Sequence, residues 1–264
     1  MSQPSREAAF YNAAYNGDGY ATFYSEHQHF AGPELRKFVT EYDLDAKRCL
    51  EVGSGRGAFQ DLVSDYTGLD LSDAVAPWYH KPFVAGSAEE LPFEDNRFDA
   101  IWSVTVLEHI PDPHKALCEM RRVLKDGGLL FLKPAWNCRP WICEGIPVRH
   151  YGDLSLRQKW IKLTLPIRDN LFIRALQALP RRLWNSVIKL PNEIDLRYRR
   201  LNADYQTFWM VDSDACSSID PFDAIQWFQS RGNVVLSHPT WRSAFLSRSE
   251  HLVVRVQKTV GTDA

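Results

Sequence analysis

Short apolar runs alternate with amphipathic stretches between residues 48 and 135. Each run has the length and the β-branched or aromatic content of a single strand, and together they predict strands at 48–52, 66–71, 82–85, 98–103 and 129–134. Strands that alternate with helices are typical of a parallel sheet covered by helices on both faces. The pattern therefore predicts a doubly wound α/β core.

Two of the intervening stretches are predicted to be helical. Residues 58–64 fit a short helix, and residues 114–124 fit a longer one, because Leu117, Met120 and Leu124 recur at i, i+3 and i+7. Pro113 stands near the start of the longer helix and Gly127 lies just past its end, as helix punctuation predicts.

The pattern changes after residue 138. Residues 139–200 interleave Arg and Lys with aromatic residues at helical spacing, and we interpret them as a helical cap inserted after the fifth strand. The α/β pattern then resumes with a helix over 221–232 and strands at 233–237 and 251–257, which brings the sheet to seven strands. We expect three parts: a helical lid at 1–47, a core at 48–138 and 201–264, and the cap at 139–200.

Charge is distributed unevenly over these parts. The whole chain has 31 basic and 33 acidic residues, and its formal net charge of −2 indicates no overall attraction to nucleic acid or to an acidic membrane. Residues 139–200, in contrast, hold 13 basic and 5 acidic residues. We expect this basic cap to select the substrate, through arginines such as Arg181 and Arg182 that could bind phosphate or carboxylate groups, or to contact an anionic membrane through 167–200.

The cysteines and the N-terminus indicate a cytoplasmic protein. The five cysteines have spacings that fit no zinc signature, and we expect them to be reduced. No signal-peptide core precedes residue 20, and no run of 18 apolar residues occurs in the chain, so neither a secreted nor a membrane-spanning protein is expected.

A glycine-rich turn carries the most specific chemistry. Glu51-Val-Gly53-Ser-Gly55-Arg-Gly57 follows the first predicted strand directly, and glycines at such a turn let the backbone approach a nucleotide-type cofactor beside a helix N-terminus. Gly53-x-Gly55-x-x-Ala58 also fits a dinucleotide-binding fingerprint, with Asp70 at a suitable separation. The turn alone leaves both cofactors open.

Later motifs separate the two cofactors. Asp70 ends the second strand, Gly86-Ser-Ala-Glu-Glu-Leu-Pro-Phe93 follows the third, and Phe98-Asp-Ala-Ile-Trp-Ser-Val-Thr-Val-Leu-Glu-His-Ile110 covers the fourth. In this order the motifs resemble those of the class I S-adenosylmethionine-dependent methyltransferases, in the group that includes ubiquinone and menaquinone methyltransferases. The resemblance covers residues 48–135 and, more weakly, 208–258. It implies a Rossmann-like seven-stranded sheet whose last strand is antiparallel.

The resemblance also implies a set of cofactor-binding residues. Glu51, Gly53 and Gly55 would line the methionine end of S-adenosylmethionine, which becomes S-adenosylhomocysteine, and Asp70 would hold the ribose. The remaining positions would surround the adenine or end the fourth strand: Leu71, Ser87, Ala88, Glu89 and Ser103. The chain departs from the family at Ser87, where the family usually has an aspartate that accepts a hydrogen bond from the adenine amino group.

His109 is the candidate catalytic base, because it follows the fourth strand and imidazole titrates near neutral pH. The alternative is that His109 only shapes the loop. Other candidate histidines are His27, His29 and His150. A related run in ubiquinone-pathway O-methyltransferases can hold a divalent cation, but Thr105 replaces the first glutamate here, so we expect no metal.

Together these observations predict methyl transfer to a small or carrier-linked acceptor, with an anionic acceptor as one option, and they favour O-methylation of a glycan precursor or secondary metabolite. Alternatives are C- or N-methylation of a quinone, a lipid-linked acceptor or a natural product. More remote alternatives are a nicotinamide-dependent oxidoreductase or epimerase, which would want a Tyr-x-x-x-Lys pair that the chain lacks, and a non-catalytic binding module. The motifs of DNA base methyltransferases are absent, and RNA is disfavoured as a partner. The sequence indicates no oligomeric state.

Overall fold

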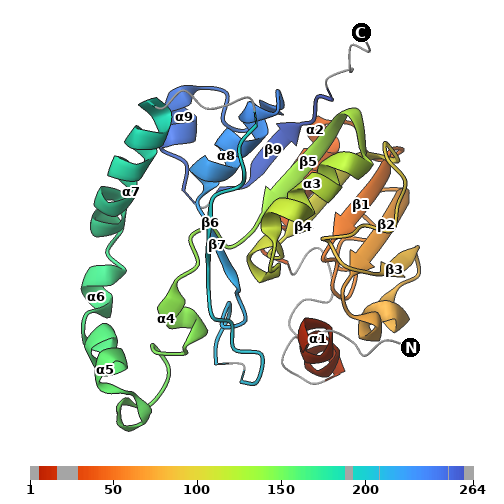
Figure 1. Cartoon of the computed structure of the whole chain (residues 1–264). Coiled ribbons are helices and arrows are strands. Elements are labelled where there is room, and N and C mark those ends of the chain that lie inside the picture. Colours follow the sequence, from red (N-terminus) through yellow and green to blue (C-terminus); the bar gives the residue numbers. More distant parts are fainter. Residues whose placement is uncertain (1–5, 17–28, 188–192, 208, 249, 259–264) are drawn as a thin grey trace.

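The computed structural model describes all residues except 1–5, 17–28, 188–192, 208, 249 and 259–264. A twisted seven-stranded sheet forms its centre, with strands in the order β3-β2-β1-β4-β5-β9-β8 (Figure 1). The strands are β1 (Arg48–Val52), β2 (Asp65–Asp70), β3 (Phe83–Ala85), β4 (Phe98–Val104), β5 (Leu124–Lys133), β8 (Val234–Val235) and β9 (Leu252–Arg255). The first five run parallel, and β9 is antiparallel to both of its neighbours. The predicted doubly wound, Rossmann-like sheet with an antiparallel last strand is confirmed.

Side chains of the central strands alternate between two apolar layers, because successive residues of a strand point to opposite faces. In β5, Leu130 and Leu132 join the cluster under α3 (Pro113–Val123) and α8 (Pro221–Ser230), whereas Leu129 and Phe131 join the cluster under α2 (Gly32–Glu41). Both faces are therefore buried, which explains why these strands read as nearly continuous apolar runs.

The turn after β1 differs from the prediction. Residues 58–64 do not form a helix; they form successive tight turns, in which the amides of Gly57, Gln60 and Leu62 each bond the carbonyl three residues earlier. Gly55 and Gly57 have φ values of +49° and +73°, outside the right-handed helical region, so a helix cannot start within the glycine turn. The longer predicted helix is confirmed as α3, which begins after Asp112, whose side chain accepts a bond from Lys115 N.

Four helices follow β5 and extend along one side of the molecule, away from the sheet (Figure 1). They are α4 (Pro140–Cys143), α5 (Leu156–Leu163), α6 (Leu165–Arg168) and α7 (Leu171–Val187), with a short 3-10 turn at Tyr151–Asp153. The end of this region was predicted to be helical but forms a strand: β6 (Tyr198–Arg200) pairs antiparallel with β7 (Ser217–Ile219). The insertion after the fifth strand thus ends in a two-stranded ribbon that leads into α8, and the predicted boundary at 200/201 falls inside that ribbon.

Two arginine contacts, of which that of Arg182 is buried, fasten α7 to the core. Arg182 is 7% exposed; its Nη2 lies 2.5 Å from Asp220 Oδ1, and its Nη1 donates to Phe245 O in α9 (Trp241–Phe245). Arg181 Nη2 lies 2.5 Å from Asp220 Oδ2 and 3.3 Å from Asp223 Oδ2. The sequence interpretation of Arg181 and Arg182 as anion-binding groups is therefore corrected, because their charges are matched by carboxylates of α8 and its N-cap.

Candidate functional site

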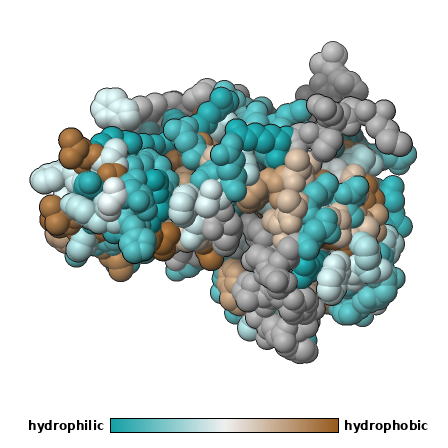
Figure 2. Space-filling model, turned by 90° about the horizontal axis from the view of Figure 1, so that it is seen from below, coloured by the Kyte–Doolittle hydropathy of each residue, from teal (hydrophilic) through white to brown (hydrophobic). Residues whose placement is uncertain are grey.

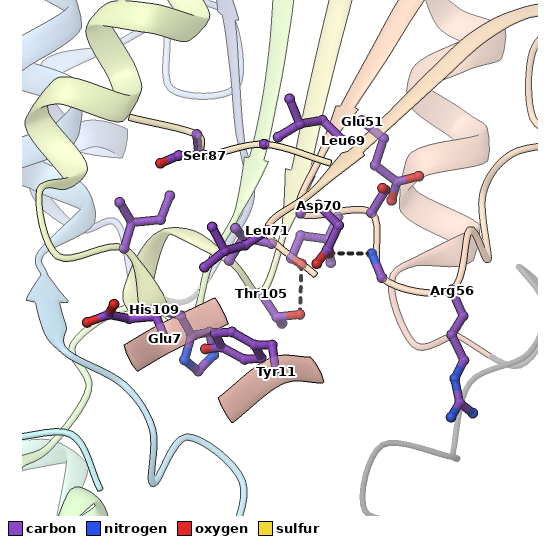
Figure 3. Close-up of a pocket in the computed structure, with 18 of the residues that line it drawn as sticks. Glu7, Tyr11, Glu51, Arg56, Leu69, Asp70, Leu71, Ser87, Thr105 and His109 are labelled. Atoms are coloured by element: carbon purple, nitrogen blue, oxygen red, sulfur yellow. Dashed lines mark hydrogen bonds between the residues drawn. The ribbon is translucent and has the colours of Figure 1, made fainter. Parts of the chain in front are cut away.

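A cavity of about 470 Å³ opens at the carboxyl ends of the parallel strands (Figure 3). It lies where the strand order reverses between β1 and β4, the usual place for a ligand in a doubly wound sheet. Its walls come from the loops after β1, β2, β3 and β4, together with α1 (Arg6–Asn16) from the N-terminal segment. Five separate parts of the chain therefore meet at one site.

The glycine turn forms one wall of this cavity. Gly53 has φ +73°, and a Cβ atom at this position would lie 2.1 Å from Val106 Cγ2 on the opposite wall. The amides of Gly53 and Ser54 both donate to Leu69 O, which holds the turn against β2. Glycine is therefore required at position 53 by both backbone conformation and close approach.

Glu51 places a buried carboxyl group behind the turn. It is 3% exposed and accepts a hydrogen bond from Tyr66 Oη, and burial raises its pKa to about 8. Within the described part of the chain no Lys, Arg or His side chain pairs with it. A ligand with a positively charged amino group would supply the missing counter-charge.

Asp70 ends β2 with its carboxylate facing the cavity, as Figure 3 shows. Its Oδ2 accepts from Gly55 N at 2.8 Å, and its Oδ1 accepts from Ser72 N at 3.0 Å. Burial raises its pKa to about 6, so the group is still mostly ionised at neutral pH. These two amides fix the carboxylate at the strand end and leave further lone pairs for hydroxyl groups of a ligand.

The other cofactor residues predicted from the sequence line the same cavity, with one exception. Leu71, Ser87, Ala88 and Glu89 all line it. Glu89 Oε1 accepts from Asp112 N at 2.8 Å, and Ser87 Oγ accepts from Glu89 N at 3.1 Å. Ser103 is 2% exposed within β4 and does not line the cavity, whereas Val104 and Thr105, the next two residues, do.

His109 lies at the opposite end of the cavity, in the 3-10 turn Leu107–His109 that follows β4. Its Nδ1 is 3.2 Å from Asp214 Oδ2, and the same carboxylate oxygen accepts a hydrogen bond of 2.9 Å from Tyr11 Oη. The Tyr11 and His109 rings meet edge to face, with centroids 6.4 Å apart. A contact between Asp214 and Nδ1 leaves Nε2 as the nitrogen that can take a proton.

The carboxylates around His109 control its protonation. Burial by itself would lower the pKa of the imidazole, but the negative charges of Asp214, Glu108 and Asp212 outweigh burial, and the net direction is upward. Figure 3 shows Glu7 and Tyr11 of α1 next to His109, so α1 brings one acidic and one phenolic group to this end. The arrangement is that of a base whose acidic partner fixes its orientation.

The remaining histidine candidates differ in their position relative to the cavity. His29 lines the cavity, and burial together with the charge of Lys133 lowers its pKa to about 4, so it is neutral at physiological pH. His150 is exposed and does not line the cavity. His27 lies outside the described residues.

Glu108, His109 and Asp212 bring potential metal-ligand atoms within 4.8 Å of one another. One oxygen of Glu108 is occupied by Ala135 N at 2.8 Å, and His109 already faces Asp214. The expectation that the chain uses no metal stays a prediction, and inspection of single sequence motifs would not have found Asp212 beside this loop.

Sequence reasoning missed Tyr11 and Asp214, the two groups that contact His109. Tyr11 belongs to the N-terminal helix, and Asp214 belongs to the end of the insertion, 105 residues after His109. The amide of Cys216 donates to Glu108 O, and Ser217 Oγ donates to Leu107 O, which ties this segment to the turn that carries His109. Neither residue stands in a motif that the sequence analysis could use.

Comparison with known proteins identifies the core of this fold. Residues 50–132 match the family model described as a methyltransferase domain. The chain contains a class I S-adenosylmethionine-dependent methyltransferase domain. The match spans β1 to β5 and includes the glycine turn, Asp70 and His109, so most of the cavity wall belongs to the methyltransferase domain, and α1 and His29 add the rest.

Curated relatives are similar to part of the chain. The phthiotriol/phenolphthiotriol dimycocerosates methyltransferase of Mycobacterium tuberculosis is 36% identical over 138 residues, which is 46% of this chain and 50% of that protein. The fatty-acid O-methyltransferase of Mycolicibacterium smegmatis is 34% identical over 119 residues, or 39% of this chain and 43% of that protein. The chain thus spans about half the length of the curated relatives it matches.

Solved methyltransferases are similar over a comparable range. CalS10, an amino pentose methyltransferase from Micromonospora echinaspora, is 26% identical, with a TM-score of 0.38, over 48% of this chain and 56% of that chain. The methyltransferase domain of this chain fits S-adenosylmethionine on its own geometry: the glycine turn and Asp70 line the cavity, and Glu51 is a buried carboxyl group without a cationic partner among the described residues.

Proposed function

We propose that the protein transfers a methyl group from S-adenosylmethionine to a hydroxyl group of a lipid-type acceptor. The observation that carries the proposal is the single cavity with two chemically different ends: Glu51, Gly53 and Asp70 at one, and His109 with Asp214 at the other. A transferase needs both a cofactor end and an acceptor end within reach of each other.

The cofactor end is proposed to bind as the sequence implied. Glu51 faces the amino group of the methionine moiety, the glycine turn follows the backbone of that moiety, and Asp70 accepts hydrogen bonds from the ribose hydroxyls. Leu71, Ser87, Ala88 and Glu89 surround the adenine. Ser103 is left out of this set, because it does not reach the cavity.

At the acceptor end, His109 is proposed to act as the general base. When bound, S-adenosylmethionine supplies an electrophilic methyl group on a sulfonium leaving group. His109 Nε2 takes the proton of the acceptor hydroxyl as the new O–CH₃ bond forms and the S–CH₃ bond breaks, with the electron pair left on sulfur. Asp214 holds Nδ1 and stabilises the imidazolium, and Tyr11 fixes the carboxylate of Asp214.

The acceptor class rests on the walls and on the relatives. Apolar side chains line the cavity, among them Val104, Val106, Ile110 and Phe59. The relatives are named for phthiotriol dimycocerosates and for fatty acids, and these names favour a lipid-type acceptor over the glycan precursor expected from the sequence. We also propose that the acceptor is anionic and that the basic cap at 139–200 contacts a membrane.

Two measurements test the proposed function. Calorimetry should detect binding of S-adenosylhomocysteine, and Asp70→Ala should weaken it strongly; no binding, or binding of NAD instead, would overturn the proposal. Transfer of a radiolabelled methyl group should then be measured to fatty-acid, long-chain diol, quinone and sugar-nucleotide pools. Transfer confined to sugar nucleotides would retain the methyltransferase and reject the lipid-type acceptor.

A further inference from the structure

The arm, defined here as helices α5–α7 (residues 156–187), exposes large apolar side chains along much of its length. Their exposed fractions reach 85% for Leu156 and 72% for Phe172. The other apolar side chains of the arm that are at least half exposed are Trp160, Leu163, Ile167, Leu171, Leu176, Leu183 and Trp184. Soluble proteins rarely expose so many large apolar groups in one region unless the region contacts a partner.

These side chains follow helical periodicity. Leu156, Trp160 and Leu163 are spaced i, i+4 and i+7 on α5, opposite the buried Ile161. Phe172, Leu176 and Leu183 are spaced i, i+4 and i+11, which places them on one stripe of α7. The opposite face of α7 carries Arg182 and Asn185, which bind carboxylates of α8 and its N-cap. Leu179 falls on the same stripe and packs against the main apolar cluster, so the stripe touches the core at that point, whereas Phe172, Leu176 and Leu183 are at least half exposed.

The charge of the arm is strongly one-sided. Between residues 156 and 187 there are seven basic residues and one acidic residue, Asp169, which pairs with Arg139. Arg181 and Arg182 fasten α7, and the other five basic residues of the arm are Arg157, Lys159, Lys162, Arg168 and Arg174. Arg157 is exposed and pairs with Glu144, whereas Lys162 and Arg168 are partly buried and bond neutral oxygen atoms, Arg149 O and Thr164 Oγ1. A surface with Trp, Phe and Leu on one stripe and Lys or Arg beside it matches the boundary layer of an anionic bilayer.

Only one end of the arm is held by the core. Leu179 packs against the main apolar cluster, and Arg182 binds Asp220, whereas α5 packs only on a small cluster of Ile146, Leu154 and Ile161. Figure 2 shows apolar residues interspersed with polar ones at the end of the molecule that the arm occupies. In the described part of the chain, no helix is both long and apolar enough to cross a bilayer.

We propose that the outer stripe of the arm docks onto an anionic lipid surface, with its helices lying in the plane of the interface. Trp160 and Phe172 insert among the headgroups, and the neighbouring lysines and arginines contact lipid phosphates. This surface deepens the proposed function, because a lipid-type acceptor would then be met where it resides. The proposed membrane contact covers residues 156–184, whereas the sequence predicted it at residues 167–200.

The test is co-sedimentation with vesicles, which requires no catalysis. We expect the full chain to bind vesicles of phosphatidylcholine and phosphatidylglycerol, to bind pure phosphatidylcholine much more weakly, and to dissociate as salt is raised. The double variant Trp160→Gln/Phe172→Gln should reduce the apparent affinity at least tenfold. The matched control is Trp78→Gln, because Trp78 is 49% exposed and lies near β3, across the sheet from the arm (Figure 1).

Three outcomes would overturn the docking surface. One is an absence of vesicle binding by the unaltered chain, and another is equal loss of binding in Trp78→Gln. The third is self-association in analytical ultracentrifugation that disappears in the double variant without any vesicle binding, which would assign the stripe to a second copy of the chain. Circular dichroism checks that both variants fold. Because S-adenosylhomocysteine binding is measured separately, failure of methyl transfer and failure of docking can be told apart.

Discussion

The core and the arm contain similar apolar residues, but the core buries them and the arm exposes them. In β4 and β5, Ile101 and Leu130 are wholly buried between two helical layers, whereas Leu156 and Phe172 of the arm are mostly exposed. The core derives its order from apolar packing on both faces of the sheet. The arm derives its position from a few charged contacts, of which Arg182–Asp220 is the most buried. Packing therefore fixes the cofactor site, and polar anchoring leaves the arm's outer surface available.

The largest effect is expected in the core, at Gly53. Gly53→Ala and Gly127→Ala both place a side chain at a φ of +73° or +74°, so both introduce similar backbone strain of about 1–2 kcal/mol. Only at Gly53 would the new Cβ meet Val106, whereas nothing lies within 4 Å of the corresponding position at Gly127. Calorimetry should find S-adenosylhomocysteine binding abolished in Gly53→Ala and retained in Gly127→Ala. Equal binding in the two variants would mean that the turn does not cradle the cofactor.

His109→Gln should lower kcat by roughly 10²–10⁴-fold, the range for loss of a general base. The affinity for S-adenosylhomocysteine should change little, because His109 lies at the acceptor end of the cavity. The matched control is His150→Gln, since His150 is exposed and away from the cavity. Steady-state kinetics would reject the assignment if both variants kept full turnover.

The anchor of the arm is tested by Arg182→Gln. Removing the arginine leaves the Asp220 carboxylate buried with only Arg181 beside it, and we expect a loss of about 3 kcal/mol in the free energy of unfolding. Arg157→Gln removes an exposed ion pair with Glu144 and should cost about 0–1 kcal/mol. Urea denaturation measures both. A similar small loss in both variants would show that the arm is held by something other than the buried pair.

The smallest predicted effect is a shift in pH dependence. The raised pKa of His109 means that activity should increase as pH rises through a value above 6.5, where the imidazole becomes neutral. Asp214→Asn removes one of the charges that raise this pKa, while Glu108 and Asp212 remain, so the acidic limb of the kcat profile should move to lower pH. A lower kcat with an unmoved limb would leave Asp214 with a merely structural role.

Prediction from sequence succeeded where local pattern and fold agree. The strand β1 begins and ends as expected, because its alternation and the following glycine turn are both encoded in neighbouring residues. The helix expected at 58–64 is wrong, because this segment forms successive tight turns closed by bonds between residues three apart, such as Leu62 N to Phe59 O. Asp70 could be placed from the strand end alone.

The partners of His109 could not be predicted in the same way. Asp214 reaches His109 only because the segment before β7 bonds to Leu107 and Glu108, and Tyr11 reaches Asp214 only because α1 lies beside the cavity. Arg182 looked like a ligand-binding group because its carboxylate, Asp220, stands 38 residues later in the sequence. Contacts at such separations are selected by tertiary packing, and a single sequence contains no periodic signal for them.

The origin of Asp214 has a consequence for how such a protein diversifies. Asp214, the acid that raises the pKa of His109, belongs to the same insertion between β5 and α8 that contains the arm. The histidine itself belongs to the methyltransferase domain. Replacing that insertion as a unit would change the acceptor, the surface on which the enzyme meets the acceptor and the pH range of activity in one step, without altering the cofactor-binding residues. Recognition and proton chemistry would then be inherited together, as one module.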